Sequence, residues 1–325
     1  MEAFERIVVK IGTNVLTDAQ GTLDLAHIGR LVDQVVHWKQ QGMDILLVSS
    51  GAVTAGRDLL PQSRHLNRVL QRQVLSSLGQ ARLMQVYEQY FSRHDCHVAQ
   101  VLATKEDFRD RRHYLNMQQC LRGLLRDKIV PILNENDVVA VTELMFTDND
   151  ELAGLVAAMI DAQALIILSS VDGLLTGPPG APGSEVIPHI DPDDSHWQQY
   201  VLPARSSFGR GGMHTKLRVA RRAAKLGITT FIANGKRPDI LTGGLTGEAP
   251  ATRFAARRQQ SSLKRRLAHH ADEQKARIVI NAGAAAALRA EDRVSSLLPV
   301  GIERIVGAFE KGDIVAIWSE DRQVG

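Results

Sequence analysis

The stretch RIVVKIGT, residues 6–13, is a short run rich in β-branched residues that reaches Lys10 and then turns at Gly12. The same arrangement returns at 45–52, where ILLV runs into SSGA. Runs of this type alternate along the chain with longer helical patterns. This alternation indicates βαβ units and a largely parallel sheet with helices on both faces. We therefore predict an α/β fold, a three-layer αβα sandwich.

The expected strands lie at 6–10, 44–49, 97–102, 129–133, 164–169 and 228–233. The expected helices lie near 24–41, 51–59, 65–93, 110–127, 149–161 and 214–226. The continuous apolar run ALIIL at 164–168 predicts a strand that is buried on both faces. Residues 176–208 are rich in Gly, Pro and Asp at their start, which predicts a long loop.

A change of composition follows the last of these helices. Six Lys or Arg residues and no acidic residue occur between 253 and 266, which is typical of a solvated linker and, as the alternative, of an RNA or subunit contact. Short strands with glycine turns are expected after it, at 277–281, 304–308 and 313–318. We predict a main domain at 1–255, a basic linker at 256–274 and a small, incomplete β module at 275–325.

Composition excludes several classes of protein. The 325 residues carry a net charge of +3, which alone is too weak to imply a nucleic-acid partner. Only two cysteines are present, Cys96 and Cys120, which argues against a disulfide framework and fits a reducing cytoplasm. No apolar run reaches about 18 residues, so we expect no membrane span. The charged strand at the N-terminus predicts no signal peptide.

Two strand ends carry residues suited to phosphate. Lys10 ends the first strand, and ligands of parallel sheets bind beyond the carboxyl ends of strands. A lysine there neutralises charge on a transferring phosphoryl group, although a solvent-facing lysine is the simpler alternative. Ser50, Gly51 and Ala52 follow the second strand at a helix start, where free N–H groups bind an anion. A plain helix cap is the alternative there.

A third phosphate-like segment lies far downstream, at GRGGMHTK, residues 209–216. Glycines that precede a helix start cradle phosphates, and Lys216 would supply a second cation. A flexible turn is the competing interpretation. The sequence has no G-x-x-x-x-G-K-[ST] motif, so this is not a P-loop site. Two lysines, several glycines and two strand-to-helix turns favour a kinase.

Two acidic and amide clusters complete the pattern. NEND, 134–137, follows a strand and suits an amino group and a carboxylate, or forms only an Asx turn. TDND, 147–150, begins a helix and exceeds what capping needs. A carboxylate there would hold two ammonium groups in place, and Asp148 could instead serve Mg²⁺. No histidine has the spacing of a zinc ligand.

Several stretches resemble the glutamate 5-kinases, a group within the amino acid kinase family. These are VVKIGTNVL at 8–16, VSSGAVTAGR at 48–57, LGQARLMQVY at 78–87, NMQQCLRGLL at 116–125, VPILNENDVVA at 130–140, TDNDELAGLVA at 147–157, GRGGMHTKLRVA at 209–220 and SSLLPVGI at 295–302. They cover nearly the whole chain in order. The resemblance implies ATP-dependent phosphorylation of the glutamate γ-carboxylate, the first step of proline biosynthesis, with Mg²⁺ bound through the phosphates.

The resemblance also implies roles for single residues. The catalytic residues would be Lys10, Lys216, Asp150 and Asp148. Glutamate would be held by Ser50, Gly51, Ala52, Asn134, Asp137 and Asn149. ATP would contact Lys10, Gly12, Ser169, Ser170, Gly209, Arg210, Gly211, Gly212, Met213 and Lys216.

Feedback inhibition by proline and assembly into a homodimer or homotetramer are further expectations from the resemblance. The C-terminal module resembles a PUA domain, a class that can bind RNA, and it is expected to be shortened. Ser170 stands where the family usually has Asp, and Arg210 where it usually has Thr. Two alternatives therefore stay open: a weakened paralogue with a regulatory or RNA-binding role, and a related kinase acting on another acceptor.

Overall fold

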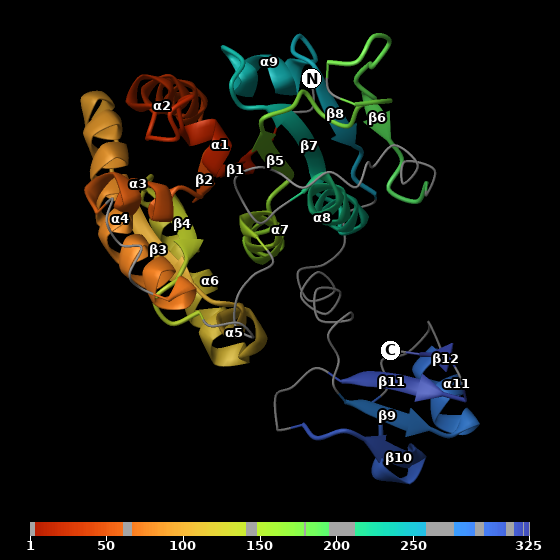
Figure 1. The fold of residues 1–325 in the computed structure, drawn as a ribbon. Coiled ribbons are helices and arrows are strands. Elements are labelled where there is room, and N and C mark those ends of the chain that lie inside the picture. Colours follow the sequence, from red (N-terminus) through yellow and green to blue (C-terminus); the bar gives the residue numbers. More distant parts are fainter. Residues whose placement is uncertain are drawn as a thin grey trace.

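The computed structural model describes residues 4–60, 67–140, 148–178, 180–194, 212–257, 276–289, 296–309, 315–320 and 322–324. The chain forms an eight-stranded sheet and, near the C-terminus, a four-stranded sheet (Figure 1). None of the helices among these residues has the length and hydropathy needed to cross a membrane.

The large sheet has β1 near its centre. In spatial order its strands are β3 (Val98–Ala103), β4 (Val130–Glu135), β2 (Asp44–Ser49), β1 (Arg6–Ile11), β5 (Ala164–Ser169), β7 (Thr229–Asn234), β8 (Ala251–Phe254) and β6 (His189–Ile190). Every neighbouring pair is parallel except β7 and β8. The carboxyl ends of β1, β2, β4, β5 and β7 therefore meet at one edge of the sheet.

Helices cover both faces of this sheet. One face packs against α2 (Leu25–Gln40), α4 (Arg68–Phe91) and α9 (Ile240–Thr246), and the other against α6 (Arg111–Arg126), α7 (Asn149–Met159) and α8 (Met213–Lys225). Side chains of β1 alternate between the two layers, with Ile7 and Val9 in one core and Val8 in the other. The predicted αβα sandwich with a mostly parallel sheet is confirmed.

Several short elements were not predicted. They are α1 (Thr13–Leu16), η2 (Ser92–His94), α5 (Lys105–Arg109), α9, β6 and β8. The short helix α3 (Ala52–Leu59) agrees with the helix expected near 51–59. The stretch 176–208, expected as a loop, contains the two-residue strand β6, which pairs with β8. Elements of this length carry too few residues to show a hydrophobic period.

The crossing of α3 and α4 depends on two glycines that let the helix backbones touch. A Cβ added at Gly79 would lie 1.7 Å from the carbonyl oxygen of Ala52, and one added at Gly56 would lie 1.9 Å from that of Leu75. No side chain can occupy either position without moving a helix. This close contact fixes α4 beside the turn that follows β2.

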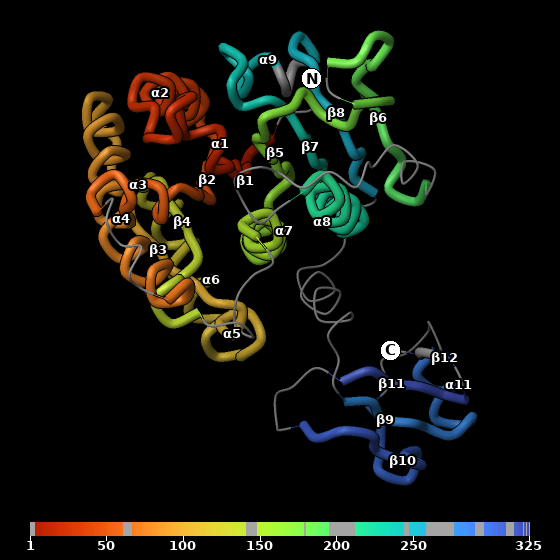
Figure 2. The backbone as a smooth tube through the Cα atoms, viewed as in Figure 1, coloured from red at the N-terminus to blue at the C-terminus, as the bar shows by residue number. Residues whose placement is uncertain are grey.

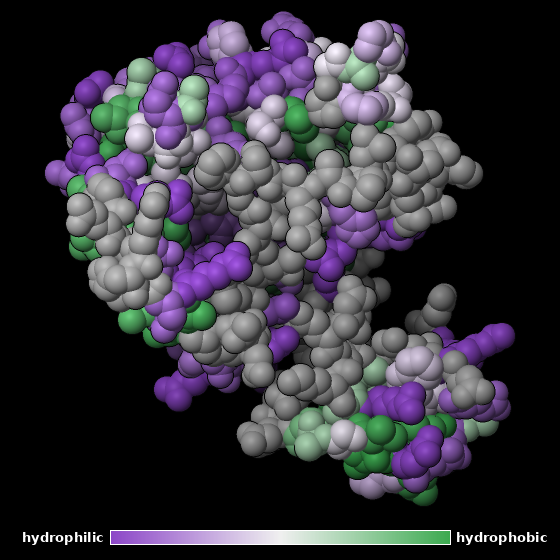
Figure 3. All heavy atoms as spheres, viewed as in Figure 1, coloured by the Kyte–Doolittle hydropathy of each residue, from purple (hydrophilic) through white to green (hydrophobic). Residues whose placement is uncertain are grey.

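The C-terminal sheet has its own small core. Its strands are, in order, β10 (Ile302–Val306), β9 (Arg277–Ile280), β11 (Ala316–Ser319) and β12 (Arg322–Gln323), with the helix α11 (Ala282–Arg289) and the turn η5 (Pro299–Gly301). Ile278, Ile280 and Ala285 form the core. Hydrophobic side chains also reach the surface of this module (Figure 3), among them Leu298 and Val300. The expected short strands are confirmed; the alanine-rich α11 was not predicted.

The contact between α3 and α4 can be tested with Gly79→Ala. We expect a loss of about 2–3 kcal/mol in the free energy of unfolding, because the added methyl group overpacks two helix backbones. Urea denaturation measures it.

Gly123→Ala is the matched control, since a Cβ there meets nothing within 4 Å. This change should instead stabilise α6 by roughly 0.5–1 kcal/mol through helix propensity. Equal effects of the two substitutions would contradict the proposed contact.

Candidate active site

Two lysines from distant parts of the chain meet on one carboxylate. Lys10 Nζ lies 2.6 Å from Asp150 Oδ1, and Lys216 Nζ lies 2.8 Å from Asp150 Oδ2. Asp150 has no exposed surface, and Lys10 and Lys216 are only 5% and 8% exposed. Each carboxylate oxygen therefore holds one ammonium group, and two positive charges lie side by side with a single negative charge between them.

The fold brings these three side chains to the same edge of the sheet. Lys10 lies near the carboxyl end of β1, Asp150 in the first turn of α7 and Lys216 in the first turn of α8. The two helices pack side by side (Figure 2), and the ion pairs of Asp150 bring the first turns of both to Lys10 of β1. Helix N-termini carry partial positive charge, which together with the lysines suits an anionic ligand.

Asp148 caps α7 and lies next to this cluster. Its Oδ1 accepts hydrogen bonds from the backbone N–H groups of Asp150 and Glu151, at 3.0 and 3.1 Å. Its Oδ2 is buried without a hydrogen-bond partner among the described residues. Burial, and then the neighbouring charge of Asp150, raise the pKa of Asp148 to about 6. Asp148 is thus a carboxylate with one oxygen available to a cation.

Asp150 behaves in the opposite way. Its complete burial acts to raise its pKa, but the charges of Lys10 and then Lys216 outweigh that effect and hold the pKa below its usual range. Asp150 is therefore ionised at every physiological pH, and the two ion pairs persist there.

A network of amides and hydroxyls lies directly beside the lysines. Asn149, the neighbour of Asp150, donates through Nδ2 to Ser50 Oγ and to Asn134 Oδ1, both at 2.9 Å. Asn134 in turn donates to Gln80 Oε1 at 2.9 Å. The predicted residues Ser50, Asn134 and Asn149 are thus brought together, and they join the ends of β2 and β4 to the start of α7.

The turn after β2 is shaped by Gly51, whose φ of 103° is a left-handed conformation that favours glycine. Gly51 caps α3, and Ala52 begins that helix. Ser49 is buried beneath the turn and exchanges a 2.8 Å hydrogen bond with the hydroxyl of Tyr87. Burial raises the pKa of that hydroxyl, so Tyr87 remains neutral and serves as a hydrogen-bonding support.

Asp137 lies in a pocket of about 310 Å³ beside this network. The pocket is also lined by Ala52, Gln80, Glu135 and Asn136. Asp137 does not bond to Asn134 or Asn149; it accepts from Arg72 Nε at 2.7 Å, and Arg72 also reaches Glu135 at 3.0 Å. The pocket thus has an acidic wall next to an amide wall, which suits a zwitterionic amino acid.

The predicted nucleotide residues that the structure describes lie at the end of β1, the end of β5 and the start of α8. The carbonyl of Ser169 accepts from the N–H of Gly235 at 2.8 Å, and Ser170 is exposed. Gly212 caps α8, and Met213 is its first residue. Gly209, Arg210 and Gly211 lie outside the described residues. Gly12 packs closely beside Lys10, because a Cβ there would lie 3.3 Å from the carbonyl oxygen of Leu168 and 3.4 Å from Lys10 Nζ.

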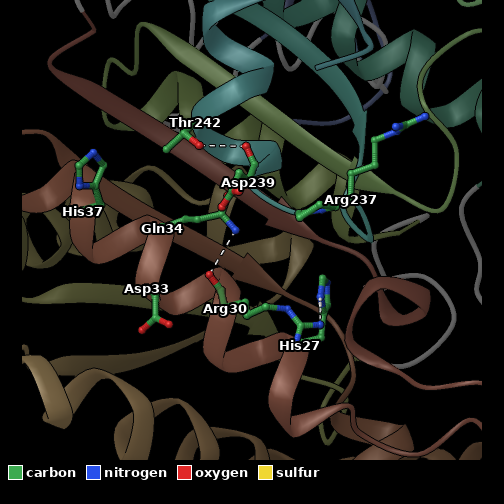
Figure 4. Close-up of a pocket in the computed structure, with 9 residues that line it drawn as sticks. His27, Arg30, Asp33, Gln34, His37, Arg237, Asp239 and Thr242 are labelled. Carbon is green, nitrogen blue, oxygen red and sulfur yellow. Dashed lines mark hydrogen bonds between the residues drawn. The ribbon is translucent and has the colours of Figure 1, made fainter. Parts of the chain in front are cut away.

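A second, slightly larger pocket of about 360 Å³ lies elsewhere, between α2 and the segment that leads from β7 into α9 (Figure 4). Its lining includes His27, Arg30, Arg237 and Asp239, and no residue of the predicted site. The convergent lysines and the carboxylates with displaced pKa values lie outside it. Two lysines that meet on one buried carboxylate beside an amide network are a more specific sign of an active site than pocket size, so the surroundings of Asp150 are the candidate active site.

Four supporting residues were not predicted as site residues, namely Arg72, Gln80, Tyr87 and Glu135. Gln80, Tyr87 and Glu135 fall inside the stretches LGQARLMQVY and VPILNENDVVA that carry the resemblance. Nothing in the sequence distinguished Arg72 from other arginines on α4. No cluster of three or more His, Cys, Asp or Glu side chains able to hold a metal occurs among the described residues.

Comparison with known proteins bears on the family. Residues 5–234 match the amino acid kinase family, and residues 276–325 match the PUA domain. A protein named Glutamate 5-kinase from Chlorobaculum tepidum is 49% identical over 321 residues, which is 99% of this chain and 88% of the relative. A protein of the same name from Bacteroides thetaiotaomicron is 47% identical over 97% of this chain and 88% of the relative.

Solved structures agree on the fold. Carbamate kinase from Giardia lamblia bound to AMP-PNP matches with a TM-score of 0.59 at 16% identity, over 79% of this chain and 100% of that one. UMP kinase from Ureaplasma parvum matches with a TM-score of 0.55 at 16% identity, over 77% and 98%. At this identity the likeness concerns the fold alone.

The raised pKa of Asp148 can be tested with Asp148→Asn, which keeps the capping oxygen and removes the charge. The folded chain holds the Asp148 proton more tightly than the unfolded chain does, so ionisation of Asp148 costs stability as the pH rises from 3.8 to about 6. We expect the variant to be more stable than the parent by about 1–3 kcal/mol at pH 8, with the difference vanishing near pH 4.

Asp110→Asn is the control, because Asp110 also caps a helix but is exposed and its pKa is lowered. This variant should gain no stability between pH 4 and 8 in the same urea titrations. A stability difference for Asp148→Asn that does not change with pH would refute the raised pKa.

Proposed function

Since this chain belongs to the amino acid kinase family and is similar over nearly its whole length to proteins named Glutamate 5-kinase, we infer that it phosphorylates the γ-carboxylate of L-glutamate with ATP. The product is γ-glutamyl phosphate, and the reaction is the first step of proline biosynthesis. The observation that carries this inference is the pair of lysines on Asp150, at the edge of the sheet where the amide network also lies.

The chemistry needs charge neutralisation rather than proton transfer. A γ-carboxylate is already ionised at neutral pH, so one of its oxygens forms a bond to the γ-phosphorus of ATP while the bond from that phosphorus to the bridging oxygen breaks and ADP leaves. No general base is required. Lys10 and Lys216 would bind the oxygens of the transferring phosphoryl group, where their charge counts most.

Asp150 would keep both ammonium groups in position without binding the substrate. Asp148 fits Mg²⁺, because its buried Oδ2 has no hydrogen-bond partner among the described residues and is the kind of oxygen ligand that Mg²⁺ prefers. The two lysines beside it favour binding of the phosphate groups that would carry the ion. Mg²⁺ would be held there mainly through phosphate oxygens and would supply further charge neutralisation. The described residues around it offer no complete metal site of their own.

The amide network would hold the acceptor. Asn149 is the residue before Asp150, so the groups that bind glutamate and those that bind phosphate start from one helix turn. Ser50, Asn134 and the backbone at Gly51 and Ala52 would bind its carboxylates, and Asp137 would bind its ammonium group. Positioning of this kind is the main contribution that a phosphotransferase makes to its rate.

The nucleotide side would be formed by Gly12, Ser169 and Ser170 together with the segment from Gly209 to Met213. Ser170 offers a hydroxyl where the family usually has a carboxylate, and Arg210 would add a cation near the phosphates.

Feedback inhibition by proline, assembly into a dimer or tetramer, and the domain limits at 255 and 275 stay predictions. The linker 256–274 lies almost wholly outside the described residues.

The activity is tested with purified chain, ATP, Mg²⁺ and glutamate in the presence of hydroxylamine, which traps an acyl phosphate as its hydroxamate. We expect hydroxamate only when ATP and glutamate are both present. Parallel reactions with aspartate, acetylglutamate, carbamate and UMP separate this function from that of related kinases. No product with any acceptor would favour a regulatory or RNA-binding paralogue, which salt-dependent RNA retention would then support.

The lysine roles are tested by Lys10→Ala and Lys216→Ala. Each should lower kcat by about 100-fold or more, because the lost charge acts mainly in the transition state. Lys39→Ala, at a half-buried position in the last turn of α2, is the control and should retain the parent kcat. A change confined to KM for either lysine would contradict its assignment.

The role of Asp137 is tested by Asp137→Ala. Loss of the group that binds the substrate ammonium should raise KM for glutamate by about tenfold or more while kcat changes much less. KM for ATP should stay constant. Equal, small effects on all three constants would count against this role.

A further inference from the structure

Arg72 contacts two carboxylates, Asp137 and Glu135, that line the pocket of about 310 Å³ beside the amide network, hereafter the acceptor pocket. Its Nε lies 2.7 Å from Asp137 Oδ1, a second nitrogen contacts the same oxygen, and that nitrogen lies 3.0 Å from Glu135 Oε2. Asp137 and Glu135 are 7% and 6% exposed. The Arg72 side chain is only partly buried, at 27% exposure, so its guanidinium closes the acidic wall from the solvent side.

The charges explain why a cation is needed there. Two carboxylates so near each other and so far from solvent repel one another, and a cation that contacts both offsets this repulsion. Arg72 offsets one of the two negative charges. The three side chains together then carry a net charge of −1, which matches a single ammonium group.

The geometry also leaves one oxygen for a ligand. Both contacts of Arg72 with Asp137 are to Oδ1, and no hydrogen bond from the described residues reaches Oδ2. Asp137 lines the pocket, whereas Arg72 does not. Arg72 therefore holds the carboxylate from outside the pocket and fixes its orientation.

The helix α4 also supports the amide groups beside the acidic wall. Gln80, two turns beyond Arg72 on α4, binds the side chain of Asn134. Arg72 binds that of Asp137. One rigid helix thus holds the first and last polar groups of the NEND cluster, and the close contact at Gly79 sets its distance from the turn after β2.

We propose that Arg72 is a positioning residue for glutamate, which holds the Asp137 carboxylate in the orientation that receives the α-ammonium group of the substrate. This proposal rests on the function inferred above. It differs from direct recognition, in which Arg72 would itself bind the α-carboxylate of glutamate. The two arrangements predict different responses to a ligand that lacks the amino group.

The experiment compares Arg72→Gln, Arg72→Lys and the control Arg68→Gln, which makes the same chemical change at an exposed position on α4. Three constants are measured for each protein: kcat, KM for glutamate, and the inhibition constant of glutarate, which has both carboxylates and no amine. Thermal unfolding shows whether a substitution destabilises the fold, and KM for ATP shows whether it disturbs the nucleotide site.

We expect Arg72→Gln to raise KM for glutamate by about tenfold or more, with kcat and KM for ATP nearly unchanged. Glutarate inhibition should weaken less than about threefold, since no ammonium group is involved. Arg72→Lys should recover part of the loss, and Arg68→Gln should match the parent.

Equal weakening of glutamate and glutarate would overturn the proposal and indicate direct contact with a carboxylate. A parent-like Arg72→Gln would overturn it as well. Failure of the parent chain to phosphorylate glutamate would instead refute the proposed function, so the two failures are distinguishable.

Discussion

The structure depends on a single carboxylate that has no contact with solvent. A buried, unpaired charge is strongly unfavourable, and Asp150 is tolerated only because one lysine ammonium meets each of its oxygens. The three groups come from β1, α7 and α8, so the ion pairs tie a central strand to two helices on one face of the sheet. The ion pairs that stabilise the buried Asp150 also place two cations at the edge of the sheet where ligands of parallel sheets bind.

The start of α7 then sets the relation between donor and acceptor. Asn149 and Asp150 are consecutive, yet Asn149 bonds to Ser50 and Asn134 while Asp150 bonds to the two lysines. Consecutive residues of a helix point about 100° apart, so one turn can serve two adjoining sites. The spacing between the phosphoryl site and the amino-acid site is therefore fixed by the backbone of a single helix turn, which suits a reaction whose rate depends on alignment.

Much of this arrangement could be predicted from the sequence. The periods of the longer elements gave the order of strands and helices, and strand ends such as Lys10 and Asn134 follow from the rule for parallel sheets. The convergence of Lys10 and Lys216 on a carboxylate was expected from chemistry together with the family resemblance. Two kinds of feature were not predicted: side chains placed by contacts between distant parts of the chain, and very short strands. Arg72 and Gln80 lie on a helix whose face toward the pocket depends on the Gly79 contact, and β6 and β8 are too short to show a period.

The most direct measurement is a crystal structure of the chain with Mg²⁺, a non-hydrolysable ATP analogue and glutamate. The account predicts that Lys10 Nζ and Lys216 Nζ both lie within about 3.2 Å of oxygens of the terminal phosphoryl group, that both still contact Asp150, and that the γ-carboxylate of glutamate faces the terminal phosphorus. A structure in which either ammonium group points away from the nucleotide, or in which the nucleotide binds elsewhere, would contradict it.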